Sequence, residues 1–472
     1  MNFVQIEFPI FLVIVFTLYW VIRDRRWQNA LLVIGSGIFY GWIHPWFLIL
    51  LYGSAVLDFS LAQAIERYPR RKRWFVAMSL MGNLGLLAYF KYFNFFVENT
   101  IFALQQAGMT TNLTTLQILL PVGISFYTFQ TLGYTIDVFR GELKARTNFL
   151  DYLLYVSFFA QLVAGPIERA GRLLPQIEND RTFDIEQVRS GFALAMWGGF
   201  KKLVVADTVA PYVDKVYILD QPAGPLIWAA TAAFMIQIYA DFSGYTDIAR
   251  GTARMLGFKL VENFNAPFIA RTTVEFWQRW HMSLSFWIRD YILGPLVDSQ
   301  SGVSRWRFAW ATMLTFVLIG FWHGASWNFI LFGLYHGFWV IAYGLIVRWI
   351  PESAKRIPGG NALAIAFHLV VVGLFGSMLF REQHVDRIVQ YLSVNPVAAS
   401  PDEWVATLVI LAVTSIVTVP LLVGYLFDVY VKPRVEDTVW YLPMQTTAWA
   451  GYAMMMGLFY RQTAQDFVYF QF

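Results

Sequence analysis

The chain has 472 residues, of which 57% are hydrophobic and only 14% are charged, and it contains no cysteine. Roughly 25% of the residues in a soluble domain are charged, so this composition predicts an integral membrane protein that lies in a lipid bilayer. The absence of cysteine excludes disulfides, thiolate metal sites and cysteine-based acyl-enzyme chemistry. The net charge of +4 accompanies no basic tail or nucleic-acid-binding motif, so no nucleic-acid partner is expected.

The first apolar segment, FPIFLVIVFTLYWVI at residues 8–22, is followed by the sequence RDRR. In a cleaved signal peptide the basic residues come before the apolar run, so the order seen here favours a retained transmembrane helix. Because Lys and Arg collect on the cytoplasmic side of membrane proteins, the N-terminus is predicted outside and residues 23–26 are predicted in the cytoplasm.

The next charged segments fit this orientation. The basic segment ERYPRRKRW follows two further apolar runs and is again predicted to be cytoplasmic. No Lys or Arg occurs between Lys91 and Arg140. A loop near 98–117 is therefore predicted outside, before a returning helix near 119–139.

Apolar segments continue to the end of the chain, with no internal repeat, low-complexity stretch or soluble domain between them. About ten or eleven spanning helices are expected, because each needs ~20 apolar residues to cross ~30 Å of hydrocarbon. The chain is accordingly predicted to be one all-α, polytopic integral-membrane domain, residues 1–472. The further segments that support this prediction lie near 29–42, 46–65, 149–165, 190–210, 224–248, 307–321, 325–347, 362–380, 404–431 and 441–460.

The long polar interruption near 250–306 holds the sequence VEFWQRWHMSLSFWIRD, which predicts a helix. Glu275 and Arg279 are four residues apart and can pair on its surface. The segment is too charged to span lipid alone, so we expect it at the membrane interface or beside a cavity, with His281 near its buried side. Its aromatic residues recur near helical spacing and form one face, made of Phe276, Trp280 and Trp287.

The sequence WRFAWATMLTFVLIGF, at 306–321, predicts a helix of 16 residues, about 24 Å long. This is too short for a full crossing, so the helix is expected to end inside the bilayer, where WHGA follows at 322–325. His323 is therefore expected at a helix break at membrane depth. Irregular backbone is tolerated there only where it is buried in protein or lines a cavity, and an ionisable group at that depth is a candidate functional residue.

A neutral imidazole at His323 would be a suitable general base for an alcohol that attacks an acyl thioester. The alternative is a structural histidine that bonds to a backbone carbonyl at the break, and the residues alone favour neither. His336 lies 13 residues further along the chain. That spacing is about 220° around a continuous helix, so His336 is expected to serve packing or to support a neighbouring residue of the site, and not to face the same spot.

Two acidic residues in apolar surroundings allow two interpretations. Asp58 and Asp241 can each line a pore or form buried structural hydrogen bonds. No pair of histidines has the spacing of a metal site, and no Walker or dinucleotide motif occurs. Neither a metal site nor ATP hydrolysis is therefore expected.

Several long motifs, found in order along most of the chain, resemble the membrane-bound O-acyltransferase family and specifically its alginate O-acetyltransferase branch. They are LLPVGISFYTFQTLGYTIDVFRGE (119–142), SFFAQLVAGPIERAGRLLPQI (157–177), GFKKLVVADTVAPYVDKVY (199–217), the block at 239–292, GFWHGASWNFILFGLYHG (320–337) and the C-terminal FVYFQF.

This resemblance implies a fold in which about ten or eleven transmembrane helices, with re-entrant and interfacial helices, surround a central funnel. It implies that His323 is the catalytic histidine, either as a general base or as a transient carrier of the acyl group, and that His281 is a second catalytic position. Asp241, Trp322 and Asn328 are candidate substrate-binding residues.

The resemblance also implies an activity for a multi-pass protein of the bacterial inner (cytoplasmic) membrane. An acyl group, acetyl in this branch, passes from a cytoplasmic acyl thioester such as acetyl-CoA to a cell-envelope or extracellular polysaccharide such as alginate. Periplasmic or extracytoplasmic acetyltransferase proteins are the expected partners, the polysaccharide is reached indirectly, and no bound cofactor is expected.

One segment departs from the alginate pattern. After RDY that branch usually continues into a Leu-Gly-Gly-Asn-Arg type sequence, whereas this chain reads ILGPLVDSQSGVSRWR at 292–307. The replacement is similar to the branch that transfers D-alanine to teichoic acid, so that activity is an alternative. A transporter or flippase of an envelope precursor is a second alternative, although the two-fold repeats and paired midplane charges of many transporters are not found.

Overall fold

The computed structural model describes residues 1–163, 165–297, 304–346, 360–460 and 467. This part of the chain consists of helices and connecting loops and contains no strand, in agreement with the predicted all-α class. Residues 298–303 of the departing segment, and all of the C-terminal motif except Phe467, lie outside the described residues.

Contacts divide the chain into two compact units, and unit 1 comprises residues 1–192 and 249–262. Apolar runs expected near 29–42 and 46–65 are present as α2 and α3, but α6 begins five residues later than the helix expected at 119. The helices of unit 1 are α1 (Glu7–Val21), α2 (Arg25–Gly41), α3 (Phe47–Arg67), η1 (Pro69–Arg71), α4 (Lys72–Leu87), η2 (Ala88–Tyr92), α5 (Phe93–Gln106), α6 (Ile124–Arg140), α7 (Phe149–Ser157), α8 (Phe159–Leu162) and α9 (Ala170–Glu178).

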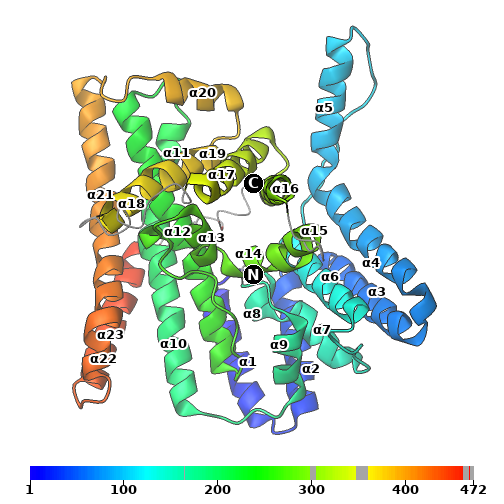
Figure 1. Ribbon diagram of the computed structural model, residues 1–472. Helices are drawn as coiled ribbons and strands as arrows, with labels where there is room; N and C mark the ends of the chain where they lie inside the picture. The colour runs from blue at the N-terminus through cyan, green and yellow to red at the C-terminus, as the bar shows by residue number, and fades with distance from the viewer. Residues whose placement is uncertain (164, 298–303, 347–359, 461–466, 468–472) are drawn as a thin grey trace. The chain divides into compact units, whose positions relative to one another are not determined.

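A buried polar cluster surrounds Asp58 where α3, α4 and α6 lie side by side (Figure 1). The Asp58 carboxylate accepts hydrogen bonds from the Ser79 hydroxyl, from the Asn83 amide at 2.7 Å and from the Thr135 hydroxyl at 3.0 Å. Ser79 and Asn83 belong to α4 and Thr135 belongs to α6, so one carboxylate joins three helices. Asp58 therefore forms structural hydrogen bonds, which is one of the two interpretations that its sequence allowed.

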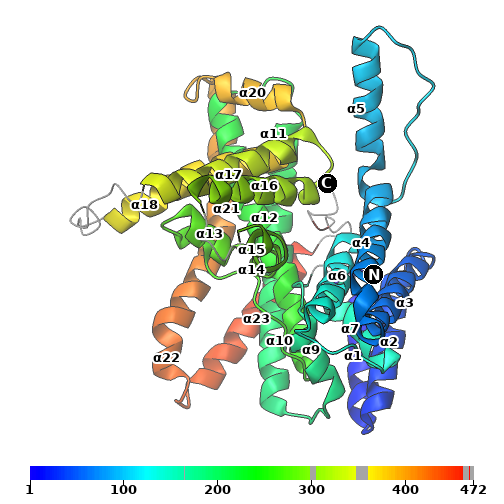
Figure 2. The ribbon, with the colours of Figure 1, turned by 45° about the vertical axis from the view of Figure 1, so that its right-hand side comes forward.

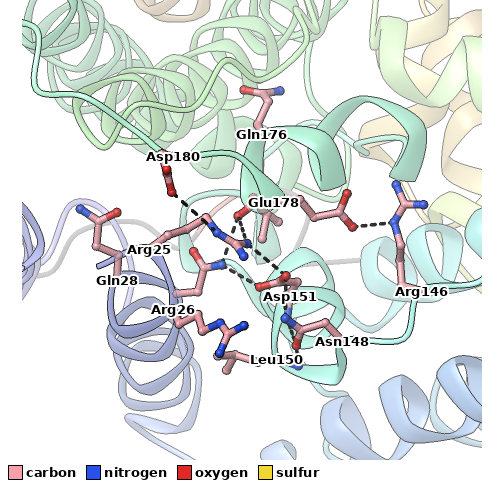
Figure 3. A network of polar contacts seen from close by, with 12 residues as sticks. Arg25, Arg26, Gln28, Arg146, Asn148, Leu150, Asp151, Gln176, Glu178 and Asp180 are labelled. Atoms are coloured by element: carbon pink, nitrogen blue, oxygen red, sulfur yellow. Dashed lines mark hydrogen bonds and ion pairs between the residues drawn. The ribbon is translucent and has the colours of Figure 1, made fainter. Parts of the chain in front are cut away.

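A second polar network joins α2, α7 and α9 (Figure 3). The Asp151 carboxylate in α7 accepts hydrogen bonds from Arg25 at 3.2 Å, from Asn29 at 2.8 Å and from Asn148 at 2.8 Å. Arg25 and Asn29 also donate to the backbone carbonyl of Ile177 in α9. Hydrogen bonds between charged groups are stronger than those between neutral groups, so this network fixes how α2 meets α7 and α9.

Glu168, in the loop between α8 and α9, is almost completely buried. Its Oε1 accepts the backbone N–H of Val261, whereas its Oε2 has no hydrogen-bond partner among the described residues. Burial raises the pKa of this carboxyl to about 7, and the Val261 N–H and the charges of Arg172 and Arg250 oppose that shift. Glu168 thus holds the segment after α12 to this loop through only one of its two oxygens.

Unit 2 comprises residues 193–248 and 263–472, so α10 and α12 each have residues in both units. Its helices supply the residues of the candidate site described below. They are α10 (Ile185–Phe200), η3 (Lys201–Ala206), α11 (Asp207–Tyr217), α12 (Gly224–Met255), η4 (Pro267–Ile269), α13 (Thr273–Arg279), α14 (Met282–Ile288), η5 (Arg289–Leu293), α15 (Gly294–Val297), α16 (Arg305–His323), α17 (Trp327–Ile346), α18 (Gly360–His368), η7 (Leu369–Leu374), α19 (Phe375–Arg381), α20 (Val385–Ser393), α21 (Pro401–Leu426), η8 (Phe427–Val431), α22 (Lys432–Val435) and α23 (Tyr441–Phe459).

The helices α16 and α17 form a tightly packed antiparallel hairpin in unit 2 (Figure 2). A Cβ on Gly320 would lie 2.0 Å from the Phe329 carbonyl oxygen, and one on Gly333 would lie 2.4 Å from the Phe316 carbonyl oxygen. Any side chain at these two positions would separate the backbones. Small residues allow such close approach of helices in membranes, where lipid tails remove most of the hydrophobic drive for association.

Five helices in the described part of the chain are long and apolar enough to cross a membrane. They are Phe47–Arg67, Gly224–Met255, Trp327–Ile346, Gly360–Arg381 and Pro401–Leu426. Two shorter segments, Glu7–Val21 and Phe149–Leu162, are also apolar. The chain is therefore a multi-pass membrane protein, but the expected count of ten or eleven spanning helices is not confirmed.

Candidate active site

The predicted helix break beside His323 is present, but it lies two residues later than expected. His323 is the last residue of α16, Gly324 has extended backbone, and α17 begins at Trp327. A Cβ on Gly324 would lie 2.1 Å from the Phe329 ring, so glycine alone fits at this turn. α16 has 19 residues and is thus about 28 Å long, which is three residues longer than the helix expected at 306–321.

The His323 imidazole is 4% exposed and lies among aromatic rings. Its ring centroid is 5.0 Å from that of Trp322, 5.2 Å from that of Phe380 and 5.8 Å from that of Phe332. The same imidazole lines a cavity of about 40 Å³ inside unit 2. The residue that the sequence singled out therefore faces a small cavity.

His336 lines this cavity as well. Its ring centroid is 4.3 Å from that of Phe332, which also contacts His323. The expectation that the two histidines face different directions assumed a continuous helix from one to the other. The chain reverses at the break, so the antiparallel packing of α17 on α16 brings His336 back to the same space.

The opposite wall of the cavity comes from η7 and α19. This wall is held to α17 by two hydrogen bonds: the Tyr335 hydroxyl donates to the Val371 carbonyl, and the Asn328 amide donates to the Leu379 carbonyl at 2.9 Å. The residues that line the cavity from this wall are Val372, Gly373, Gly376, Ser377 and Phe380, and the remaining sides are formed by Met235, Ile238, Phe268, Phe276, Trp277 and Trp280. The lining is apolar and largely aromatic, with few polar groups.

Two of the lining residues carry buried polar atoms whose hydrogen bonds are not made within the described chain. Neither Nδ1 nor Nε2 of His336 has a partner there, and neither does the indole Nε1 of Trp277. His336 is 2% exposed and Trp277 is 7% exposed. A buried polar atom without a partner costs about 1–3 kcal/mol, so this arrangement lowers the stability of the fold.

His281 lies at a second break, which the sequence did not predict. The segment expected as one helix is divided into α13 and α14, and His281 between them has a φ of +43°. Its Nδ1 lies 3.0 Å from the Asn263 Oδ1, and the imidazole is fully buried. Burial lowers the pKa of His281 to about 3, so the ring is neutral at physiological pH.

The expected pairing in this segment is present, whereas the expected aromatic face is present only in part. Arg279 pairs with Glu275 at 3.0 Å, as their spacing predicted. The ring of Phe276 in α13 stacks on that of Trp280, just after the end of α13, with centroids 5.6 Å apart, whereas Trp287 lies in the separate helix α14. That aromatic face borders the cavity, because both residues line it.

The structure brings three of the five predicted site residues near one another. The Trp322 ring contacts His323 and also His281, with ring centroids 6.0 Å apart in the second case. Asp241 instead forms an ion pair with Lys202 at 2.6 Å, and the same Lys202 ammonium lies 2.8 Å from Asp207. Asn328 is fully buried and bonds to Ser326 and to the backbone of α19. Of the five, His323 alone is among the described residues that line the cavity.

Among the lining residues that matter most here, the sequence singled out neither Trp277 nor Gly376, and it did not place His336 at the same site as His323. A Cβ on Gly376 would lie 2.8 Å from the His336 Nε2, so this glycine gives the imidazole its room. A histidine, a tryptophan and a glycine from three distant segments carry no shared spacing in the sequence. Within the described residues, no group of three or more His, Asp or Glu gathers in a way that would hold a metal ion.

Comparison with known proteins gives a family match and several relatives. Residues 138–381, just over half of the chain, match MBOAT, the membrane-bound O-acyltransferase family. The chain is 37% identical over 382 residues to a probable alginate O-acetylase AlgI of Pseudomonas aeruginosa, with 80% of this chain and 71% of that protein covered.

Two further relatives are named for other activities. A peptidoglycan O-acetyltransferase of Helicobacter pylori is 32% identical over 346 residues, covering 67% of this chain and 64% of that protein. A teichoic acid D-alanyltransferase of Bacillus subtilis is 30% identical over 285 residues, covering 56% of this chain and 70% of that protein.

Proposed function

Because the chain belongs to the membrane-bound O-acyltransferase family, we propose that it transfers acetyl groups across the membrane for O-acetylation of an envelope or extracellular polysaccharide such as alginate. The observation that carries this proposal is the position of His323, which ends α16 and faces a cavity lined mainly by apolar and aromatic side chains. We assign the polysaccharide by similarity to the alginate O-acetylases, because their sequences align with a larger part of this chain than that of the D-alanyltransferase does.

The proposed chemistry needs one neutral imidazole. His323 accepts the proton of an acceptor hydroxyl while the hydroxyl oxygen attacks the carbonyl carbon of an acyl thioester, for which we propose acetyl-CoA. The carbon–sulfur bond of the tetrahedral intermediate then breaks. The departing thiolate takes the proton from the His323 imidazolium, so the products are an ester and a free thiol, and the histidine returns to its starting state.

We assign His281 to a supporting role in this reaction. Its neutral ring contacts Trp322, which in turn contacts His323, so a change at His281 reaches the base through one indole. Trp322 and Asn328 are proposed to shape the substrate path, and Asp241 to act through its ion pair with Lys202. No bound cofactor is needed for this chemistry.

The cellular setting is proposed to be the bacterial inner membrane, with the acyl donor on the cytoplasmic side. Extracytoplasmic acetyltransferase proteins would pass the group to the polysaccharide. Both units are proposed to belong to one acyltransferase domain, in which shorter apolar helices such as Glu7–Val21 add to the five long spans, towards the ten or eleven expected.

The test is the O-acetyl ester content of envelope polysaccharides in cells that carry wild type, His323→Ala or His281→Ala at matched membrane levels. Removal of a general base slows a reaction about 10²–10⁴-fold, so His323→Ala should abolish the esters and His281→Ala should reduce them. His368→Ala is the control, because this buried histidine lies outside the cavity lining and both its nitrogens have partners, Ala364 O at 2.9 Å and Thr273 Oγ1 at 3.3 Å.

Unchanged ester levels with His323→Ala would make His323 a structural histidine and would overturn the proposal. The transporter alternative predicts a different result, namely that transport of the donor or precursor falls with the ester level. For an acyltransferase, uptake of the donor stays at the wild-type value while ester formation stops.

A further inference from the structure

The cavity that His323 faces has a second titratable side chain, His336, which the proposed chemistry does not use. The hairpin of α16 and α17 supplies both imidazoles, and the wall formed by η7 and α19 supplies small side chains opposite them. A buried histidine normally satisfies its ring nitrogens, as His368 does in the same unit. His336 does not do so within the described chain, and the Trp277 indole beside it does not either.

These polar atoms lie close together. The ring centroids of Trp277 and His336 are 5.1 Å apart, and their planes are nearly perpendicular. A neutral imidazole carries one N–H donor, and an indole carries another. Two donors that border one cavity and lack acceptors among the described residues are suited to a ligand that presents an oxygen atom to both.

The size of the cavity limits the ligand. One water-sized group needs about 10–15 Å³ of such volume, so 40 Å³ accommodates about three non-hydrogen atoms. An acetyl group has that number: a methyl carbon, a carbonyl carbon and an oxygen. An acetyl group thus matches the volume that the lining residues leave, and each further methylene needs additional room.

The charge of the lining narrows the choice further. Apart from the two imidazoles, the described residues that line the cavity have apolar, aromatic and small side chains, and none of them is a carboxylate. An ammonium group is costly to bury without a paired carboxylate, so a D-alanyl group does not suit this site.

We propose that this cavity is the acyl pocket of the enzyme and that it selects a neutral two-carbon acyl group. His336 and Trp277 donate hydrogen bonds to the acyl carbonyl oxygen, and the wall of Val372, Gly373 and Gly376 limits the length of the chain. The inference rests on the proposed acyltransferase function and adds to it the pocket that holds the acyl group and the residues that select acetyl.

The experiment measures acyl transfer by membranes that contain the full chain, with acetyl-, propionyl- and butyryl-CoA as probes. Thiol release reports turnover without background from the protein, because the chain has no cysteine. Val372→Ala should lengthen the pocket and raise the propionyl-to-acetyl ratio of kcat/KM at least about tenfold, since a pocket distinguishes one methylene by ~10–200-fold.

His336→Phe and Trp277→Phe keep an aromatic ring and remove the donor. Each should lower kcat for acetyl transfer about 10²-fold, because donors to a developing oxyanion act mainly in the transition state. Gly376→Ala should do the same by displacing the imidazole. His368→Gln is the matched control and should leave both kcat and the chain-length ratio at wild-type values.

An unchanged chain-length ratio in Val372→Ala, together with full acetyl transfer by His336→Phe, would overturn the pocket assignment. If His323→Ala stays inactive in that case, the acyltransferase function stands without this pocket. If His323→Ala is also fully active, the proposed function fails instead. If His336→Phe folds poorly, the propionyl-to-acetyl ratio of kcat/KM in Val372→Ala tests the pocket assignment by itself. A wild-type protein that transfers none of the three acyl groups would also contradict the inference.

Discussion

Asp58 in unit 1 and His336 in unit 2 are both buried polar residues in long apolar helices, yet their surroundings are opposite. The Asp58 carboxylate accepts hydrogen bonds from Ser79, Asn83 and Thr135. The His336 imidazole faces a cavity and has no hydrogen-bond partner within the described chain. One residue holds three helices together, whereas the other reduces the stability of its helix.

The difference separates structural polar groups from those that await a ligand. Buried polar groups in folded proteins are nearly always paired, so a paired one needs no explanation beyond the fold. An unpaired one opposes stability and is usually retained for another purpose, such as binding. Hydropathy cannot distinguish Asp58 from His336, because both interrupt an apolar run in the same way.

The largest expected effect on stability comes from removing the Asp58 carboxylate, whose hydrogen bonds are all made. Asp58→Ala leaves three buried partners without their acceptor, and at about 1–3 kcal/mol for each group the free energy of unfolding should fall by roughly 3 kcal/mol or more. Thermal unfolding in detergent measures this, with Asp58→Asn as a milder variant that keeps one acceptor oxygen. Equal stability of Asp58→Ala and wild type would remove the structural role.

Glu168 is intermediate between Asp58 and His336, because one of its carboxyl oxygens is paired and the other has no partner in the described chain. Its contribution to stability should depend on pH. Burial raises its pKa from 4.5 to about 7. The contribution of Glu168 to the free energy of unfolding is therefore fully present below about pH 4.5, where the carboxyl is protonated. This contribution is lost as the pH rises through 7.

Wild type should accordingly lose on the order of 2 kcal/mol more stability between pH 5 and pH 8 than Glu168→Gln does, at ~1.4 kcal/mol per pKa unit. The measurement is the melting temperature of both proteins at the two pH values. Parallel pH profiles would show that Glu168 is ionised in the folded state at both.

The hairpin that carries both histidines can be tested through its glycines. Gly320→Ala places a Cβ against the Phe329 carbonyl, so α16 and α17 must separate, at a cost of about 1–3 kcal/mol. Gly344→Ala in α17 is a matched control, since a Cβ there meets no atom within 4 Å. If both variants unfold at the same temperature, close packing of the hairpin is not what holds these helices.

The smallest expected effect has the opposite sign. His336→Phe removes two ring nitrogens that have no partners in the described residues and keeps a ring of similar shape. Its free energy of unfolding should match that of wild type or exceed it by up to about 1 kcal/mol, although acetyl transfer is lost. A marked loss of stability would mean that His336 is paired in the folded protein, and the contrast with Asp58 would disappear.

Much of the fold follows from the sequence, because long apolar runs suffice to predict helices such as α3, α12 and α21. The pairing of Glu275 with Arg279 and the turn after His323 also follow, since both depend on neighbouring residues. The site was only partly predictable. The break at His281 needs Asn263, 18 residues away, and the place of His336 depends on the reversal of the chain.

Residues far apart in the chain account for the rest. Trp277, His336 and Gly376 share one cavity, but each belongs to a segment whose local pattern predicts only a helix. Asp241 is recognisable in the sequence as an acid in an apolar run, but its partner Lys202 belongs to a different helix and cannot be found from the local pattern. Single-sequence patterns report periodicity and local spacing, and neither contains such contacts.

The cavity has its two imidazoles on one hairpin and its small side chains on a separate segment, residues 372–380. A change in acyl preference therefore requires mutations only in that short segment, while the base and the hydrogen-bond donors stay in place. Such a division lets related enzymes diverge in the group they transfer and keep a common chemistry. It also marks a few adjacent codons as the place to begin if the protein is to be altered to attach a different ester.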